Sequence, residues 1–427
     1  MRAVIRSRIR LFRSCACGFS LLCCASANAE EQAAPATPVG VMDRPRPEYD
    51  AQGIALGDWM LFPALLALAN YDDNVFRLPD TEKSDWFFET TPILRLSRKW
   101  ETSQLGFSAN ADSFAYARLK HLGLTDWTVA GSGQTAILPK LAAAASAYYG
   151  EYHEGFESAD TLRFQQSPTR YFRVHADSIV NYEPGDWAIT GGATFDSYSW
   201  RPTMLIDSSR VSNSDRDESI FAPYLRLSYN FMRGYQAFFR ASYDGRDFAQ
   251  TADRFGYRRS SNGYRLDTGL AIAFGDTWRG EAFIGHLRQN FANNPAAPLP
   301  DVSALDYGAD ITWYASPDVT MHFMASRSLS DIVLPGVSVS DDQFVRLAGD
   351  WQPLSNVILQ GSIGYVNSQL RGMPRTDQYV SGSLVVRYLI NRFASIQAAY
   401  YYNDRDSDEP LIRFRDDTLS LGVNLHI

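Results

Sequence analysis

The sequence offers few side chains whose type and spacing could carry out catalysis. Its six histidines are far apart, and none has the partner of an H-x-x-x-H or H-E-x-x-H metal motif. It contains neither a G-x-S-x-G nucleophile turn nor a phosphate-binding P-loop. The nearest approach to a hydrolase pair is His322 with Ser326 and Ser328. On a strand, His322 and Ser326 would share a face but lie about 13 Å apart. We therefore expect no enzyme, no catalytic residue, no bound metal and no cofactor.

Arginine and aspartate form a more informative pattern, because they recur on every second position between apolar residues. For example, Tyr235, Phe239 and Tyr243 alternate with Arg240 and Asp244. If the apolar set faces outward, the charged set lines the interior of a closed sheet. The predicted lumen-lining residues are Arg95, Arg173, Asp177, Arg226, Arg240, Asp244, Arg246, Arg265, Asp267, Asp306, Asp310, Arg346, Asp350 and Arg387. These side chains can brace the wall by pairing with one another, or they can contact a solute, and we expect both roles.

The elements that position these residues are strands. From Thr418 to the end of the chain, Leu419, Leu421, Val423, Leu425 and Ile427 alternate with polar or small residues. Successive side chains on a strand point to opposite faces, so one face is apolar and the other polar. A strand of a soluble sandwich has the same period, and what separates the two is repetition along the whole chain. Aromatic residues often end the apolar rows, as the interfacial girdles of membrane barrels require.

The breaks between strands alternate in length. Short breaks lie near 99–101, 139–140, 183–186, 233–234, 275–277, 316–318, 353–355 and 391–392. Longer polar or Pro-rich breaks lie near 71–83, 118–123, 154–168, 201–216, 249–260, 292–302, 331–341, 371–376 and 406–412. Tight turns on one side and long loops on the other are typical of outer-membrane barrels. The pattern predicts an all-β, antiparallel up-and-down barrel of about 18 strands over residues 58–427, with both termini in the periplasm.

The first 29 residues are typical of a secretory signal peptide. Five arginines precede and enter a short apolar stretch, and Ala27-Asn28-Ala29 forms a small-x-small cleavage site. A lipoprotein signal is the alternative because cysteines lie nearby, but none has the required spacing. All four cysteines (Cys15, Cys17, Cys23 and Cys24) fall within the signal, so the mature chain would carry no thiol into an oxidising compartment.

Composition narrows the remaining classes. After the signal, the longest apolar run is residues 59–69 and contains Pro63, which is too short for a spanning helix of about 20 residues. Only helices and closed barrels satisfy every backbone group inside lipid, so a membrane protein of this sequence must be a barrel. Removing the five signal arginines leaves 35 basic against 48 acidic residues, a net charge of −13. This balance argues against nucleic acid as a partner.

Residues 30–57 precede the predicted barrel. The run from Ala33 to Pro38 is small and Pro-containing, and Asp43-Arg-Pro-Arg-Pro-Glu-Tyr-Asp50 has two prolines that enforce an extended path. This N-terminal segment is either a spacer or a segment tucked into the periplasmic mouth. Further on, Tyr71-Asp-Asp-Asn-Val-Phe76 would lie at the first outer loop. Its Asp and Asn residues could make a turn or bind a cation, and a turn is favoured because both residue types prefer turns.

These motifs, over residues 43–77, resemble the opening of the putative β-barrel porin 2 family, the outer-membrane barrels encoded in exopolysaccharide operons. The residues that carry the resemblance are Arg44, Pro45, Pro47, Tyr49, Gly53, Gly57, Asp72, Asp73 and Asn74. The rest of the chain matches only as alternating strands, which many barrels share, and the terminal Ile427 departs from the usual Phe. The family has no agreed catalytic residues, so none is transferred.

The resemblance implies a barrel in the outer membrane of a Gram-negative bacterium that passes polymer to the cell surface. We expect passive export of exopolysaccharide through a polar lumen, with long loops gating the outer mouth. The expected partners are outer-membrane lipid, a polysaccharide chain, periplasmic export machinery and the barrel-assembly machinery. The alternatives are a general or substrate-selective diffusion porin and, from another class, a barrel enzyme that acts on outer-membrane lipid.

Overall fold

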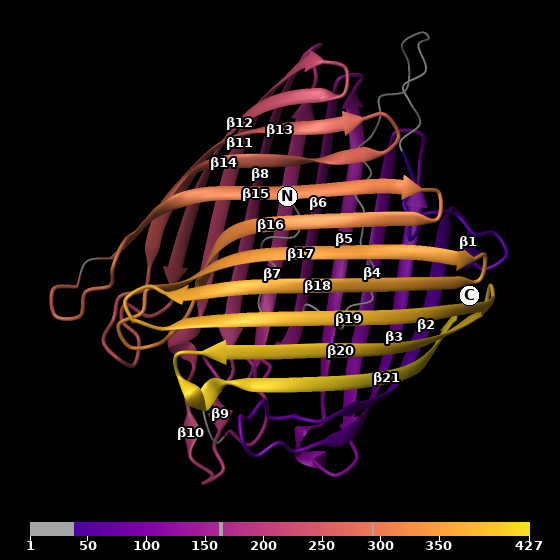
Figure 1. The fold of residues 1–427 in the computed structure, drawn as a ribbon. Helices are drawn as coiled ribbons and strands as arrows, with labels where there is room; N and C mark the ends of the chain where they lie inside the picture. The colour runs from indigo at the N-terminus through magenta and orange to yellow at the C-terminus, as the bar shows by residue number, and fades with distance from the viewer. Residues whose placement is uncertain (1–37, 162–164, 293) are drawn as a thin grey trace.

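Eighteen antiparallel strands form the wall of the protein. The computed structural model describes residues 38–161, 165–292 and 294–427, and the predicted signal peptide at residues 1–29 lies outside them. Each strand pairs with the next along the chain, and β2 also pairs with β21. The sheet therefore closes into the barrel seen in Figure 1, with the strands from β12 to β21 in front and those from β3 to β8 behind. The predicted barrel architecture and strand count are confirmed.

The wall consists of β2 (Trp59–Asp72), β3 (Asp85–Lys99), β4 (Ser103–Tyr116), β5 (Leu124–Leu138), β6 (Leu141–His153), β7 (Arg170–Tyr182), β8 (Trp187–Trp200), β11 (Glu218–Met232), β12 (Tyr235–Phe248), β13 (Ser261–Phe274), β14 (Trp278–Phe291), β15 (Val302–Ser316), β16 (Val319–Asp331), β17 (Val339–Leu354), β18 (Val357–Leu370), β19 (Thr376–Asn391), β20 (Ala394–Ser407) and β21 (Phe414–His426). The short strand β1 (Ile54–Leu56) pairs with the start of β2. The remaining elements are the ribbon of β9 (Thr203–Met204) and β10 (Arg210–Val211) and the 3-10 turns η1 (Lys120–Leu122), η2 (Ser214–Arg216) and η3 (Pro410–Ile412). No helix in the described ranges is long or apolar enough to cross a membrane.

The connections divide the barrel into two different ends. Eight of two to four residues lie at one end, which we call the turn end, and nine of five to 17 residues lie at the other, the loop end. They fall within a few residues of the breaks that the sequence predicts. Strand β2 begins and β21 ends at the turn end, so both ends of the barrel wall lie on that side.

Side chains alternate between the outer and the inner face of the wall, as the period of two requires. In β21, the side chain of Leu421 is 64% exposed whereas that of Ser420 is 3% exposed. The structure also shows which side chains face outward on β2 and β6, whose sequences are apolar or small on both faces. Leu65 of β2 and Tyr149 of β6 are exposed on the outside, and Leu66 is buried on the inside.

We expect Leu421→Arg to impair assembly, because a charge that faces the bilayer midplane of a barrel costs about 2–4 kcal/mol. The measurement is heat-modifiable mobility of the barrel in isolated outer membranes. Leu411→Arg is the matched control, because Leu411 is also more than half exposed but lies in η3 at the loop end. Normal assembly of both variants would show that the outer face of β21 does not contact lipid.

The ladder of the wall is interrupted near the loop end between β15 and β16. Their pairing stops at Gly308 opposite Ser326, although β16 remains paired with β17 up to Asp331. The outer part of the β16–β17 hairpin is thus free of β15. The guanidinium of Arg327 bridges the separated strands by donating a hydrogen bond of 3.0 Å to the carbonyl of Leu305.

The freed part of the hairpin folds into the barrel mouth. Its residues Leu329 and Val339 pack with Leu287 and Val302, and all four are buried. Leu287 and Val302 belong to the inward-facing sets of β14 and β15, since their neighbours in each strand are exposed on the outside. The hairpin tip therefore lies inside the wall, a position that alternation along β16 does not predict.

Candidate functional site

Ion pairs on the inner wall connect the strands from β11 to β14. Arg240 Nη2 lies 2.7 Å from Asp267, and neither side chain is more than 2% exposed. Arg226 of β11 pairs at 2.6 Å with Glu281 of β14, three strands further along the wall. Since each Arg meets a carboxylate, these residues brace the wall across several strands.

Two further arginines extend this bracing toward the loop end. Arg265 of β13 pairs with Asp306 of β15 at 3.0 Å. Arg246 pairs with Asp244 at 2.9 Å and with Asp331 at 2.8 Å. Because Asp331 ends β16, the second pair of Arg246 holds the inward-folded hairpin against β12.

The other predicted lumen residues lie on the β7–β8 side or nearer the turn end. Arg173 pairs at 2.6 Å with Asp196 of β8 and not with Asp177 of its own strand, which instead accepts a hydrogen bond from Ser146. Asp310 is exposed. Asp350 accepts a hydrogen bond of 2.9 Å from Gln360 and attracts the charge of Arg346. Arg387 lies near Arg46 of the N-terminal segment. Arg95 of β3 is opposite Phe62 of β2 and Ser108 of β4.

Sequence reasoning missed three carboxylates that complete these pairs: Asp196, Glu281 and Asp331. The alternation of β8 placed Asp196 on the polar face, so that signal was available. Glu281 meets Arg226 because tilted strands bring together side chains that are three strands apart, and Asp331 meets Arg246 because the hairpin folds inward. Neither is encoded in local spacing.

His322 lies inside the barrel. Its Nδ1 is 3.1 Å from the hydroxyl of Thr312, and its Nε2 is 3.5 Å from Asp350. Strands β15, β16 and β17 thus place the imidazole between Thr312 and Asp350 on the inner face, which is the face turned away from lipid.

The N-terminal segment is described from residue 38 to residue 57, and its residues 38–53 lie in the mouth at the turn end. Val41 is fully buried against Ile358 and Leu389, which both face inward. Ile358 lies at the start of β18 and Leu389 near the end of β19. The backbone N–H of Val41 donates to the hydroxyl of Thr320 at 3.0 Å. Of the two alternatives for this segment, a spacer or a piece tucked into the mouth, the geometry is that of the second.

The Arg-Pro-Arg-Pro motif supplies the tethers of this segment. Arg44 pairs with Asp318 in the β15–β16 turn at 3.0 Å, and Arg46 donates to Gln352 of β17 at 3.0 Å. Burial and the nearby charges of Arg44 and Arg387 lower the pKa of Arg46 below its ordinary value, although Asp50 opposes this. The segment thus brings a second positive charge beside Arg387.

The part of the segment that lies in the mouth ends at Gly53, which has a positive φ of 75°. A Cβ at this position would lie 2.7 Å from the ring of Phe62 on the inner face of β2. Only glycine combines this backbone conformation with so close an approach. This accounts for the glycine in the motif.

Residues Asp72 to Asn74 form a turn in the β2–β3 connection. The Asn74 N–H donates to Asp72 at 2.9 Å, and the Asn74 side chain bonds the carbonyls of Leu78 and Arg415. Asp72, Asp73 and Asp416 gather their carboxylates as a cation site would, but the guanidinium of Arg77 lies 3.0 Å from Asp72 and 2.6 Å from Asp416. Burial alone lowers the pKa of Arg77, and these carboxylates raise it above its ordinary value. The positive charge of the cluster is therefore supplied by the protein.

A lid covers part of the mouth at the loop end. It is the β6–β7 connection, residues 154–169, of which 162–164 are not described. The Asp160 carboxylate accepts a hydrogen bond of 2.9 Å from the backbone of Val333 in the β16–β17 connection. Ala159 also packs against the cluster of Ile332, Val337 and Leu370. Seven strands separate β6 from β16 in one direction and nine in the other, so the lid reaches across the mouth.

The lid is anchored at its base by Arg216 of η2. This guanidinium pairs with Glu154 at 2.7 Å and Asp160 at 3.3 Å, and its Cζ lies 3.6 Å from the ring centroid of Trp200. All three charged side chains are about 5% exposed. Burial lowers the pKa of Arg216, but Glu154 and Asp160 raise it above its ordinary value, so the guanidinium stays charged.

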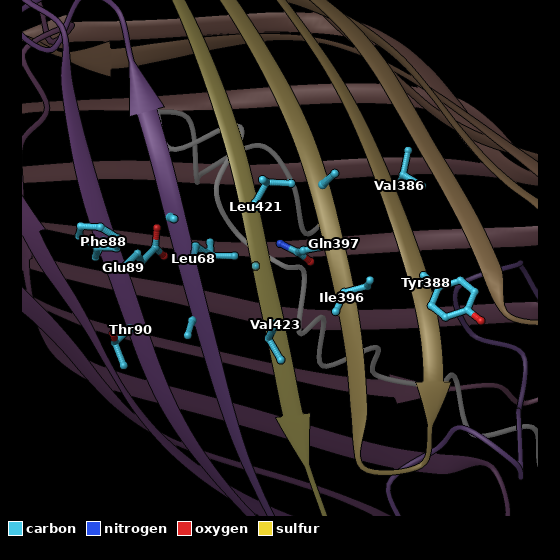
Figure 2. Close-up of a pocket in the computed structure, with 14 residues that line it drawn as sticks. Leu68, Phe88, Glu89, Thr90, Val386, Tyr388, Ile396, Gln397, Leu421 and Val423 are labelled. Carbon is cyan, nitrogen blue, oxygen red and sulfur yellow. The ribbon is translucent and has the colours of Figure 1, made fainter.

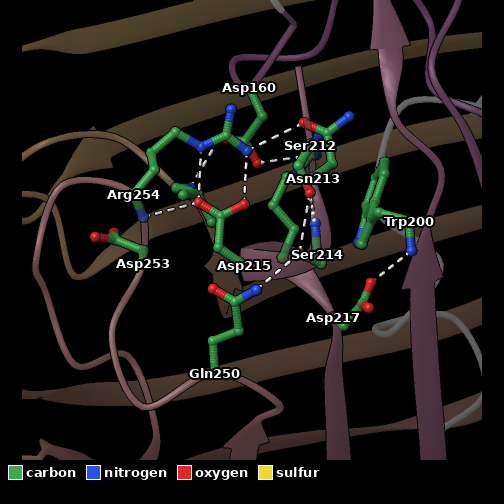
Figure 3. Close-up of polar contacts among 12 residues, drawn as sticks. Asp160, Trp200, Ser212, Asn213, Ser214, Asp215, Asp217, Gln250, Asp253 and Arg254 are labelled. Atoms are coloured by element: carbon green, nitrogen blue, oxygen red, sulfur yellow. Dashed lines mark hydrogen bonds and ion pairs between the residues drawn. The ribbon is translucent and has the colours of Figure 1, made fainter. Parts of the chain in front are cut away.

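The neighbouring connections hold η2 in place. Figure 3 shows Arg254 of the β12–β13 connection reaching Asp215, with Nη2 and Oδ1 2.6 Å apart, and Gln250 donating to Ser214. Arg259 of the same connection pairs with Asp253 and donates hydrogen bonds to three carbonyls of the β16–β17 connection. The lid, η2 and the folded-in hairpin thus form one hydrogen-bonded layer.

A hollow on the opposite, outer face of the wall is apolar. Figure 2 shows it over β19, β20, β21, β2 and β3, lined by Phe88, Tyr388, Ile396, Leu421 and Val423 among others. These side chains belong to the exposed sets of their strands and face the lipid. The polar chemistry of the molecule therefore lies in the lumen and not in this hollow.

Solved structures with a similar shape include outer-membrane porins of very low sequence identity. Pseudomonas aeruginosa OccK2 (OpdF) in complex with glucuronate is 12% identical, with a TM-score of 0.45 over 88% of this chain and 100% of its own. A BenF-like porin from Pseudomonas fluorescens Pf-5 is also 12% identical, with a TM-score of 0.45 over 87% of this chain and 100% of its own. P. aeruginosa OpdK is 12% identical, with a TM-score of 0.43 over 86% and 98%. No curated protein sequence matches the chain.

The family comparison is more direct. The model described as "Putative beta-barrel porin 2" matches residues 46–427, which include all 18 wall strands and most of the N-terminal motif. This extends the resemblance from residues 43–77 to nearly the whole described chain. The protein is accordingly a porin-like barrel of the Gram-negative outer membrane. The chain belongs to the putative β-barrel porin 2 family.

Proposed function

We propose that this barrel exports exopolysaccharide to the cell surface, with its turn end in the periplasm. The observation that carries the proposal is that both mouths hold segments of the same chain. The N-terminal segment is tethered through Arg44 and Arg46 at the turn end, and the lid is anchored by Arg216 at the loop end. An export channel carries polymer only during synthesis, so segments that close both mouths at other times and are displaced by the polymer would prevent leakage.

The lumen suits a hydroxyl-rich polymer. A barrel of 16–18 strands is wide enough for an aqueous channel. Its inner wall presents charged and hydroxyl side chains in place of an apolar core, and most of its arginines already meet a carboxylate. Because the charges are mutually neutralised, a polymer would slide past hydrogen-bonding groups without being held by an unpaired charge. Periplasmic export machinery would deliver the chain and displace the N-terminal segment.

The second candidate is a general or substrate-selective diffusion porin. The exposed carboxylate of Asp310 favours it, because a charge that remains open inside the lumen can select small solutes by sign. An enzyme that acts on outer-membrane lipid is disfavoured, because His322 lies on the inner face with Thr312 and Asp350.

An in-frame deletion of the gene distinguishes these candidates. We expect the deletion strain to lose surface polysaccharide and to retain polymer in the periplasm, while uptake of a small sugar is unchanged. The wild-type gene should restore surface polysaccharide and remove the polymer from the periplasm. Normal surface polymer with reduced uptake of small solutes would instead identify a diffusion porin.

A further inference from the structure

Aromatic side chains gather on the inner face of β6, β7 and β8, directly below the lid. The register places Tyr152 opposite Tyr171, and Tyr171 opposite Trp200. The ring centroids of these pairs are 5.8 and 4.5 Å apart. We call these three residues the aromatic row. Outward-facing neighbours such as Val174 are exposed to lipid, so the row belongs to the lumen.

A second layer lies one step deeper in the lumen. Arg173 is opposite Tyr198, and its guanidinium lies 5.2 Å from the Tyr198 ring and 5.4 Å from the Tyr148 ring. Asp196 fixes this guanidinium through bonds of 2.9 and 2.6 Å and also accepts a hydrogen bond from His175. The polar side chains beneath the row are therefore rigidly placed.

The row and the layer beneath it keep polar atoms open to the lumen, although the hydroxyl of Tyr152 lies 2.9 Å from that of Thr128 and is bonded to it. Within the described parts of the chain, the phenol groups of Tyr171 and Tyr198 and the indole N–H of Trp200 form no hydrogen bond, and they are not among the buried unsatisfied atoms. All three residues are only partly buried. On β11 and β14, by contrast, Arg226 and Glu281 brace the wall by pairing with each other at 2.6 Å. Bracing alone thus does not account for the row.

We propose that the aromatic row is a binding subsite for neutral sugar residues at the outer part of the lumen. This inference deepens the proposed function and rests on the channel carrying a glycan. A pyranose ring combines apolar C–H surface with hydroxyls. Tyr and Trp rings match this combination, because each provides a rigid apolar body with one polar group at its edge. The polarised C–H groups are attracted to the electron-rich ring surface, and the phenols and indole N–H exchange hydrogen bonds with hydroxyls.

The charge around the row selects neutral over acidic sugars. Arg173 is neutralised by Asp196, and Arg216 above the row is neutralised by Glu154 and Asp160. Two further carboxylates face the site, because Glu218 lies opposite Tyr198 and Asp177 lies on β7 below His175. The other basic groups nearby are His153, held by Asp126, and His175, together with Arg170 and Arg201, which both pair with Glu151. Carboxylates therefore outnumber cations, and a uronic acid would be repelled.

Binding to the detergent-purified, full-length barrel tests the subsite without relying on export. The probes are maltohexaose and a hexamer of galacturonic acid, followed by isothermal titration calorimetry. We expect maltohexaose to bind more tightly than the uronate. Tyr171→Ala should weaken maltohexaose binding at least tenfold, and Tyr171→Phe with Tyr198→Phe, which keeps both rings, should weaken it several-fold. Tyr243→Ala is the matched control, because Tyr243 is an exposed aromatic residue on the outer face of β12.

The outcomes separate the subsite from the export function. Unchanged affinity in folded Tyr171→Ala and in the double Phe variant, absent binding to the wild type, or tighter binding of the uronate would each overturn the subsite. If the variants lose sugar binding while a gene deletion leaves surface polymer normal, the subsite stands and the export function falls. If the deletion abolishes surface polymer but maltohexaose does not bind, the export function stands and the subsite falls.

Discussion

Arg240→Ala is expected to lower the free energy of unfolding of the barrel by about 3–5 kcal/mol, because it leaves a buried carboxylate without its counterion. The partner Asp267 has a side chain with no exposed surface, and Arg240 holds it through Nε and Nη2 at 3.0 and 2.7 Å. Glu281 lies 3.9 Å away and would also lose a neighbouring cation. The measurement is the urea concentration at which barrels in lipid vesicles lose their heat-modifiable mobility.

Two controls make this prediction specific. Arg413→Ala removes an ion pair of similar length, 3.1 Å to Asp406, whose side chains are at least half exposed. Exposed pairs contribute about 0–1 kcal/mol, so this variant should be nearly neutral. Arg240→Met with Asp267→Leu removes both charges and should recover most of the loss, because a buried pair can be replaced by apolar residues at little cost. A loss below 1 kcal/mol for Arg240→Ala would contradict the bracing role of the pair.

The barrel itself could be predicted from the sequence because it depends on local spacing. The period of two in residues 418–427 assigns each side chain of β21 to one face, and the alternation of short and long breaks sets the number of strands. Strands β2 and β6 are less clear, because their inner faces are also apolar or small. Phe62 of β2 is covered by Gly53 of the N-terminal segment, which explains an apolar residue on the wet side.

What could not be predicted depends on contacts between distant segments. Arg226 pairs with Glu281 because tilted strands bring together side chains three strands apart. Leu329 has the spacing of a lipid-facing residue, yet it is buried in the mouth because β16 leaves β15 beyond Ser326. Asp160 reaches a backbone N–H 173 residues away. Loop length and composition do not specify any of these contacts, and together they determine how open the lumen is.

Release of the lid is expected from Arg216→Ala. The substitution leaves Glu154 and Asp160 buried without their cation and removes the guanidinium stacked on Trp200. Breaking such a pair costs about 3–5 kcal/mol. If that energy holds the lid closed, the ratio of open to closed channels rises by at least about 100-fold, since about 1.4 kcal/mol corresponds to a factor of ten. Single-channel recording in planar bilayers measures this ratio directly.

A matched variant separates gating from a general loss of charge at the mouth. Arg201→Ala removes a cation from the same connection, but Arg201 is about half exposed and pairs with Glu151 outside the lid. The open probability of the Arg201→Ala channel should equal that of the wild type. Arg216→Lys keeps the charge but not the bidentate contact with Glu154, and it should fall between the two. Because Arg216 also lies above the aromatic row, the Arg216→Ala channel should admit maltohexaose from the loop end more often. Equal open probability in Arg216→Ala and the wild type would show that the layer formed by the lid, η2 and the β16–β17 hairpin is a fixed part of the wall and does not gate the channel.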